Sequence, residues 1–132
     1  MAAGEPPSSR DRYRGCLLGG AVGDALGAPA EFLSRAEILR QFGPDGIRSY
    51  AHAYGRLGAI TDDTQMTLFT ADGLLRAWVC RRLGGSIGDV EATALAYLRW
   101  LRTQGQDPAD EVSPYIGSPG WLFAQRDLHS RR

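Results

Sequence analysis

The stretch from Thr61 to Leu83, TDDTQMTLFTADGLLRAWVCRRL, decides the fold of this chain. Its apolar residues fall on more than one side of a helical period, which predicts a helix that is apolar most of the way round and central in its domain. We expect the helix to stop at Gly84-Gly85, because glycine commonly follows the last turn. A central helix of this kind needs packing partners on several sides.

Three shorter helical segments flank this stretch. One is expected over residues 10–27, a second starts from a capping box at residues 34–37 and ends at Gly43, and a third covers residues 86–104. No strand pattern of adequate length is present, so the predicted class is all-α. The residues expected to face inward on the third segment are Val90, Ala94, Tyr97, Leu98 and Leu101.

The domain organisation follows from these segments. Residues 1–9 are small, polar and proline-containing, which predicts a disordered tail. Residues 10–132 are expected to form one helical domain. Three short helices hardly cover a central helix that is apolar on several sides, so we expect this domain to be incomplete, the N-terminal part of a larger bundle and apparently truncated.

Composition excludes several classes of protein. The chain has 132 residues and a formal net charge of zero, which argues against a direct, electrostatically driven nucleic-acid binder. It has no apolar run of about 18 residues, so we expect no transmembrane helix and no membrane partner. Cys16 and Cys80 lack the spacing of a zinc or disulfide framework, which is typical of reduced thiols in a cytoplasmic protein.

Thr61, Asp62 and Asp63 open the central helix and have two interpretations. In the first, Asp62 is the N-cap, Gln65 lies three residues later, and the acids stabilise the helix dipole. In the second, the hydroxyl and the two carboxylates bind a divalent cation, since such oxygens are preferred by magnesium, manganese or calcium. Consecutive helical side chains point about 100° apart, so convergence on one ion is expected only ahead of the first helical turn.

Asp24 and Glu31 are two further candidates. Asp24 interrupts an apolar helix, either as a hydrogen-bond partner for a neighbouring loop or as part of a site. Glu31 follows the helix end at Pro29 and has apolar neighbours. A carboxylate on a rigid turn is a common arrangement for a general acid or base, and a purely structural role remains the alternative.

These residues carry a family resemblance. The blocks are Arg14 to Gly20 (RGCLLGG), Gly23 to Glu31 (GDALGAPAE) and Thr61 to Met66 (TDDTQM), and Gly117 to Trp121 (GSPGW) is similar to a later glycine loop. Together they resemble the ADP-ribosylglycohydrolase family, which includes the dinitrogenase-reductase-activating glycohydrolases. The resemblance implies an all-α orthogonal bundle with a centre of two Mg²⁺ or Mn²⁺ ions.

The resemblance also implies roles for individual residues. Thr61, Asp62 and Asp63 would be metal ligands, and Glu31 would act as general acid/base or position water. The loop with Gly117, Ser118 and Gly120 would contact ADP-ribose, and Asp24 would be structural or support the metal ligands. The implied reaction is hydrolysis of the glycosidic bond between ADP-ribose and an acceptor, in an ADP-ribosylated protein or a small molecule.

One family feature is missing from the sequence. The resemblance implies a second Asp-x-Asp-Thr-like metal motif in a longer chain, and no Asp-x-Asp occurs here. We therefore expect weak or no activity from this chain by itself. The alternative is a non-catalytic helical remnant or binding module of the same fold, and exposed apolar helix faces would favour self-association.

Overall fold

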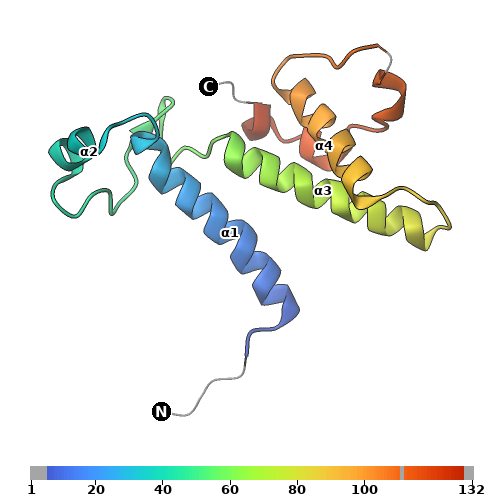
Figure 1. Ribbon diagram of the computed structural model, residues 1–132, viewed down its shortest axis with the longest axis horizontal. Coiled ribbons are helices and arrows are strands. Elements are labelled where there is room, and N and C mark those ends of the chain that lie inside the picture. The colour runs from blue at the N-terminus through green and yellow to red at the C-terminus, as the bar shows by residue number, and fades with distance from the viewer. Residues whose placement is uncertain (1–5, 111, 130–132) are drawn as a thin grey trace. The chain divides into compact units, whose positions relative to one another are not determined.

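The computed structural model describes residues 6–110 and 112–129 (Figure 1). It divides the chain into two compact units, the first ending at Thr64 and the second beginning at Gln65. Helices dominate both units, which confirms the predicted all-α class, although the described residues also include one small two-stranded sheet. The single domain predicted over residues 10–132 stays a prediction, and each unit is described by itself.

The first unit begins with helix α1, Ser9–Gly27, followed by the short 3-10 helix η1, Ala28–Ala30. Ser8 caps α1, because its side chain accepts the backbone N–H of Asp11 at 3.2 Å. Ser9 is therefore helical. Of the tail predicted over residues 1–9, positions 1–5 lie outside the described residues.

Helix α2, Arg35–Phe42, has the predicted boundaries. The capping box is present: the Ser34 side chain accepts the Glu37 N–H at 3.3 Å, and the Glu37 carboxylate accepts the Ser34 N–H at 2.8 Å. Gly43 ends the helix with φ of 86°, a left-handed conformation that favours glycine. Capping residues close together in sequence thus account for both ends of α2.

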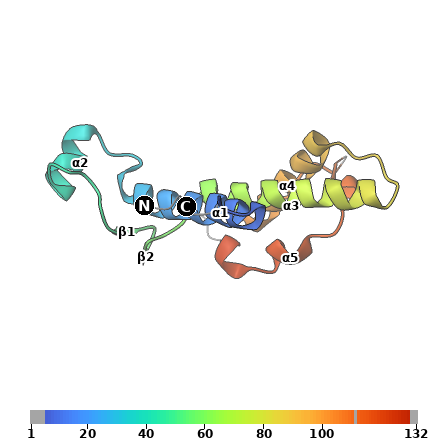
Figure 2. The same cartoon turned by 90° about the horizontal axis from the view of Figure 1, so that it is seen from below.

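A β-hairpin lies in the segment that was expected to be a loop (Figure 2). Strands β1, His52–Ala53, and β2, Arg56–Leu57, pair antiparallel, with His52 opposite Leu57 and Ala53 opposite Arg56. Tyr54 and Gly55 form the turn with φ of 49° and 80°. Positive φ at both positions is the type I′ arrangement, whose twist matches that of the paired strands.

Helix α3, Asp62–Arg82, begins at the end of the first unit, and the second unit is built on its residues from Gln65 onward and on helix α4, Asp89–Thr103. The two helices approach closely at Gly73, where an added Cβ would lie 2.9 Å from the Ala92 carbonyl oxygen and 2.9 Å from the Thr93 Cα. Both neighbouring atoms belong to the backbone and cannot swing aside. Glycine is required here by the helix contact.

Helix α4 buries a different face from the one predicted. Val90 is 86% exposed, and the helix begins at Asp89, after the N-cap Gly88, rather than at residue 86. Only small side chains of α4 fit at the close approach to Gly73. The buried Arg99 is stabilised by hydrogen bonds, and a prediction from the spacing of apolar residues cannot detect such a residue. The buried residues of α4 are Ala92, Ala96, Arg99 and Thr103.

Short elements complete the second unit: the 3-10 helix η2, Ser113–Tyr115, helix α5, Gly120–Phe123, and the 3-10 helix η3, Arg126–His129. They follow α4 in the sequence and add the apolar side chains of Ile116, Leu122 and Leu128 to the core. The buried apolar residues of this unit are Phe69, Ala77, Ala92, Ala96, Ile116, Leu122 and Leu128.

Helix α3 is not buried on all sides, although its apolar composition predicted that it would be. Phe69 and Ala77 are fully buried, but the opposite side is exposed, with Leu75 at 63% and Trp78 at 53%. The side chains of Leu75, Val79, Cys80 and Leu83 line an open apolar groove of about 530 Å³. The apolar side chains on this side of α3, which had predicted a central helix, are therefore not covered by any other part of the described structure.

A helix that crosses a membrane must be both long enough and apolar enough. No single helix in residues 6–110 and 112–129 reaches both requirements. The segment Ser9–Ala30 and helix α2 meet the two requirements only when taken together, by length and composition alone, and the two parts are bent by 97° relative to each other.

Candidate functional site

The start of α3 is fixed by a threonine. The Thr61 hydroxyl oxygen accepts the backbone N–H of Asp63 at 3.2 Å, which is the bond of an N-cap residue. Helix α3 itself begins at Asp62. The expectation that Asp62 is the N-cap is therefore wrong, because the shorter hydroxyl side chain of Thr61 already occupies that position.

Asp24, in the last turn of α1, accepts four hydrogen bonds from this helix start. From Thr61 it takes the backbone N–H at 2.7 Å and the hydroxyl at 2.7 Å. From Thr64 it takes the backbone N–H at 3.2 Å and the hydroxyl at 2.5 Å. Both threonines are buried. Asp24 is thus a hydrogen-bond partner of the neighbouring segment, as one of its two interpretations required.

The electrostatics of Asp24 reflect these partners. Burial raises the pKa of the Asp24 carboxyl, but the hydrogen bonds from Thr64 and Thr61 outweigh it and hold the pKa below its ordinary value. The carboxylate also lies at the negative end of the α1 dipole, which is unfavourable by roughly 0.3–1 kcal/mol. The N-terminal N–H groups of α3 compensate for that placement.

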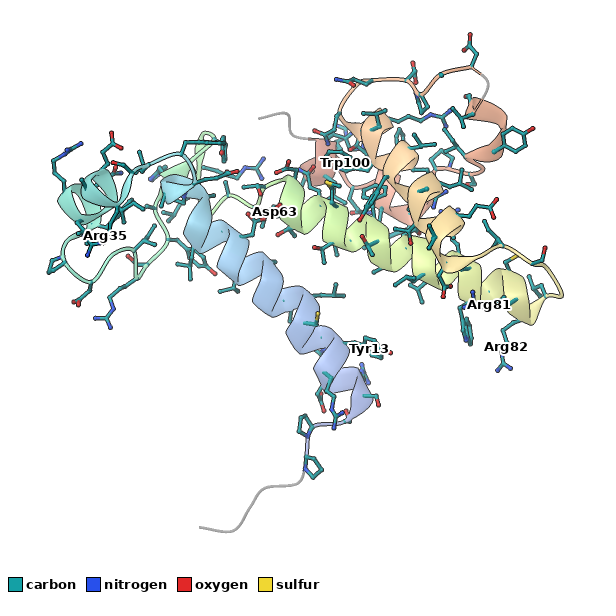
Figure 3. All side chains as sticks on the ribbon, viewed as in Figure 1. Tyr13, Arg35, Asp63, Arg81, Arg82 and Trp100 are labelled. Carbon is teal, nitrogen blue, oxygen red and sulfur yellow. The ribbon has the colours of Figure 1, made fainter. Side chains whose placement is uncertain are left out.

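Asp62 and Asp63 occupy the first turn of α3, where Figure 3 shows Asp63 at the beginning of the helix. Asp62 is half-buried and Asp63 is exposed. Both residues are helical, so their side chains point about 100° apart. Convergence of Thr61, Asp62 and Asp63 on one ion was expected only ahead of the first turn. Thr61 lies there, whereas the two acids lie within the turn, so the expected position is wrong for Asp62 and Asp63.

The donor set at this helix start fits a hard divalent cation. The Thr61 hydroxyl donates a hydrogen bond to Asp24 Oδ1, so the threonine oxygen keeps two lone pairs as acceptors, one of which accepts the Asp63 N–H. The second lone pair can face a cation beside the carboxylates, an oxygen set that suits Mg²⁺ or Mn²⁺. Among residues 6–110 and 112–129, no group of three His, Cys, Asp or Glu side chains could hold a metal. The described donors are thus a partial set.

Glu31 follows η1 and is exposed. The hydroxyl of Tyr54, at the tip of the hairpin, donates to Glu31 Oε2 at 3.0 Å. Tyr54 has φ of 49°, the one described non-glycine residue with positive φ. The strained turn residue thus holds the candidate general acid/base from a position 23 residues away in sequence.

The glycine loop predicted to contact substrate belongs to the second unit. Gly117 and Gly120 have φ of 70° and 79°, in the left-handed region. The Ser118 carbonyl accepts from Arg76 Nη1 at 3.2 Å. A Cβ on Gly120 would overlap Arg76 Nη2, so glycine leaves room for the guanidinium that holds the loop.

A buried arginine lies under the same loop. Arg99 has a side chain only 3% exposed, and it donates to the Ile116 carbonyl at 2.8 Å and to Asp72 Oδ2 at 3.1 Å. Arg76 Nε donates to that same Asp72 oxygen at 2.7 Å. Burial lowers the pKa of Arg99, the Arg76 charge lowers it further, and Asp72 partly offsets both. Arg99 Nε is buried without a partner in the described part of the chain.

The structure therefore joins some predicted site residues by hydrogen bonds and adds others. Asp24, Thr61 and Asp63 form one network, while Glu31 is joined to Tyr54. Sequence reasoning missed Tyr54, for which the glycine at position 55 in a turn-rich segment was the only, weak hairpin signal. It also missed Asp72, Arg76 and Arg99, for which charged residues within apolar helical stretches were the available signal.

Comparison with known proteins places these residues in a family. A model of the ADP-ribosylglycohydrolase family matches residues 5–130. The ADP-ribosyl-[dinitrogen reductase] glycohydrolase of Rhodospirillum rubrum is 48% identical over 66 residues, which are 47% of this chain and 21% of that protein. No solved structure shows significant similarity.

Two uncharacterized proteins are also similar. The one from Archaeoglobus fulgidus is 41% identical over 68 residues, covering 49% of this chain and 22% of the relative. YegU of Escherichia coli is 38% identical over 71 residues, covering 49% and 21%. The matched part thus spans about a fifth of the length of these relatives. Since the family match covers nearly all of the chain, the protein belongs to the ADP-ribosylglycohydrolase family.

Proposed function

We propose that this chain acts in metal-dependent hydrolysis of the glycosidic bond between ADP-ribose and an acceptor, with Thr61, Asp62 and Asp63 as ligands of Mg²⁺ or Mn²⁺. Family membership supports the general activity. The glycohydrolase of Rhodospirillum rubrum, whose name specifies ADP-ribosyl-dinitrogen reductase, supports an ADP-ribosylated protein as the substrate class. An ADP-ribose-containing small molecule is the other substrate class.

The state of the Thr61 hydroxyl carries this proposal. A threonine oxygen can bind a cation only when its O–H points elsewhere, and here that O–H donates to Asp24 Oδ1, with 2.7 Å between the two oxygens. A helix cap alone does not need an additional, half-buried carboxylate that accepts a hydrogen bond from the capping threonine. Because Asp62 and Asp63 diverge by about 100°, they suit two cation positions better than one.

Different residues of the chain have different roles in the proposed reaction. Glu31 handles the proton, giving it to the departing acceptor atom or taking it from the attacking water. Tyr54 fixes the orientation of that carboxylate. The Gly117–Gly120 loop contacts ADP-ribose through its backbone. Bound cations would polarise ribose hydroxyls or water at the anomeric carbon.

We also propose that turnover by this chain alone is slow. Mg²⁺ demands near-octahedral coordination by six oxygens, and Thr61, Asp62 and Asp63 supply only part of such a shell. Water completes the rest, which weakens both cation affinity and the orientation of substrate. Weak, metal-dependent release of ADP-ribose is therefore the expected behaviour.

The first test measures thermal unfolding with and without millimolar Mg²⁺ or Mn²⁺. Binding to the folded state raises Tm by mass action, and the rise should vanish in the double variant Asp62→Ala, Asp63→Ala. The matched control changes two exposed acids elsewhere, Asp45→Ala with Asp107→Ala, and should keep the full rise. Equal shifts in both double variants would refute the cation site.

The second test measures ADP-ribose release from an ADP-ribosylated protein. Slow release that requires Mg²⁺ or Mn²⁺ and is lost in Glu31→Gln supports the proposal. Release that persists in chelator, or that Glu31→Gln leaves unchanged, contradicts it.

A non-catalytic role has one specific observation in its favour. The groove lined by Leu75, Val79 and Leu83 is open and apolar, which suits association with a second copy of the chain. Sedimentation measurements on wild type and Leu75→Asp test this role. A dimer that dissociates in Leu75→Asp, together with no cation-dependent change in Tm, would favour the non-catalytic role over hydrolysis.

A further inference from the structure

The loop from Ile116 to Gly120 is attached to the rest of its unit through its carbonyl groups. Arg99 Nη1 donates to the Ile116 carbonyl at 2.8 Å, and Arg76 Nη1 donates to the Ser118 carbonyl at 3.2 Å. The two guanidinium groups come from different helices, α4 and α3. Two alternate residues of the loop, Ile116 and Ser118, are therefore held through their carbonyl groups.

This attachment fixes the direction of the next backbone group. A trans peptide places its C=O and N–H on opposite sides, so the Gly117 N–H points away from Arg99. Pro119 has no N–H to direct inward. An added Cβ on Gly117 would meet no described atom within 4 Å, so there is open space beside this residue in the direction of a Cβ. The loop thus presents a backbone donor, the Gly117 N–H, on the side opposite Arg99.

The charge beneath the loop is unbalanced. Arg76 and Arg99 share one oxygen of Asp72, which leaves the three side chains with one net positive charge. The Arg99 side chain is only 3% exposed, and its Nε has no partner among the described residues. Both arginines pair with the single carboxylate of Asp72, and the Arg76 side chain is 34% exposed, so the excess positive charge is partly accessible to a ligand. Positive charge under an outward-facing amide suits an anionic ligand such as ADP-ribose.

We propose that Arg99 and Arg76 are positioning residues that set the conformation of the Ile116–Gly120 loop for contact with ADP-ribose. This inference rests on the proposed function of the loop and extends it to two residues outside it. Neither arginine needs to touch the substrate. Each acts through the carbonyl that it holds.

Arg76→Lys separates the two contacts of Arg76. A lysine four residues after Asp72 keeps an ion pair with it, but its single ammonium cannot also reach the Ser118 carbonyl in the fork geometry of a guanidinium. The fold should therefore survive while the loop loses one attachment. The matched control is Arg102→Lys on α4, since Arg102 donates to the Ser113 side chain and not to the loop carbonyls.

The experiment combines two measurements on wild type, Arg76→Lys and Arg102→Lys at a temperature well below Tm. Amide resonances and hydrogen exchange of Gly117, Ser118 and Gly120 report the loop, and titration with ADP-ribose reports binding. Arg76→Lys should shift the loop amides and raise the Kd for ADP-ribose about tenfold with unchanged Tm. Arg102→Lys should leave both at wild-type values.

The outcomes separate this inference from the proposed function. Unchanged loop amides and an unchanged Kd in Arg76→Lys would overturn the positioning role and leave the proposed function standing. If wild type does not bind ADP-ribose while the loop amides still shift in Arg76→Lys, the substrate assignment falls and the arginines remain the residues that set the loop. Arg99→Lys provides the second variant, and its loop amides should shift further than those of Arg76→Lys.

Discussion

The two units of this protein each organise a candidate site around a charged side chain, and they do so in opposite ways. In the first unit Asp24 is an anion that receives four hydrogen bonds from donors at a helix start. In the second, Arg99 is a cation that shares its carboxylate with Arg76 and keeps an unpaired Nε in the described structure. The difference separates a charge that is locally satisfied from a charge that is left in excess.

The largest effect is expected from Asp24→Ala. It removes the acceptor of two backbone N–H groups and two hydroxyls, all part-buried, and should lower the free energy of unfolding by about 3 kcal/mol. Urea denaturation measures the change. Asp45→Ala, at an exposed ion pair in the same unit, should change stability by less than about 0.5 kcal/mol. Comparable losses in the two variants would contradict the role given to Asp24.

Arg99→Met should have a smaller effect, about 2 kcal/mol, although Arg99 is the more buried residue. It leaves Asp72 and the Ile116 carbonyl short of a donor, but it also removes an unsatisfied Nε and the repulsion from Arg76. The same urea denaturation applies. A loss larger than that of Asp24→Ala would show that the second cluster is the more complete network and would invert the comparison.

Acid should weaken the first unit through Asp24. Its folded-state pKa lies below the unfolded value of about 3.9, so the carboxylate stabilises the fold at every pH above that value. This contribution is lost as pH falls through the lower, folded-state pKa. Hydrogen exchange at the Thr61 and Thr64 amides, measured in chelator, should show falling protection below about pH 4. Asp24→Asn, which cannot titrate, should lack this component; an identical acid profile in Asp24→Asn would exclude Asp24 as its source.

The smallest effect concerns Tyr54. Asn is preferred over Tyr at the first position of a type I′ turn, so Tyr54→Asn should stabilise the protein by about 0.5–1 kcal/mol. It also removes the donor to Glu31, and ADP-ribose release should fall. Tyr54→Phe keeps the strain and loses the same donor, so its release should fall without any gain in stability. Higher release from Tyr54→Asn than from wild type would contradict the positioning of Glu31.

Local signals predicted the helices well, for a physical reason. The box at Ser34 and Glu37 and the stop at Gly43 act within a few residues, so their effect can be read directly from the sequence. The hairpin was missed because strands of two residues are too short to show alternation. The inward face of α4 was misassigned because a glycine on another helix, Gly73, decides which side chains fit there.

In the candidate site, too, the features set by neighbouring residues were predicted and those set by distant residues were not. Thr61, Asp62 and Asp63 were identified from adjacent residues, while the cap was assigned to the wrong one of them. The partners that give the site its chemistry lie far away in sequence: Asp24 is 37 residues from Thr61, and Tyr54 is 23 residues from Glu31. Contacts of this range depend on tertiary structure and leave no periodic signal.

The central claim is that the start of α3 binds a divalent cation, and paramagnetic broadening by Mn²⁺ tests it most directly. Substoichiometric Mn²⁺ added to isotope-labelled protein should broaden the amide resonances of residues 61–64 first, with recovery on adding chelator. The double variant Asp62→Ala, Asp63→Ala should lose this selectivity. Broadening that is strongest at acids elsewhere, or that persists in the double variant, would contradict the account.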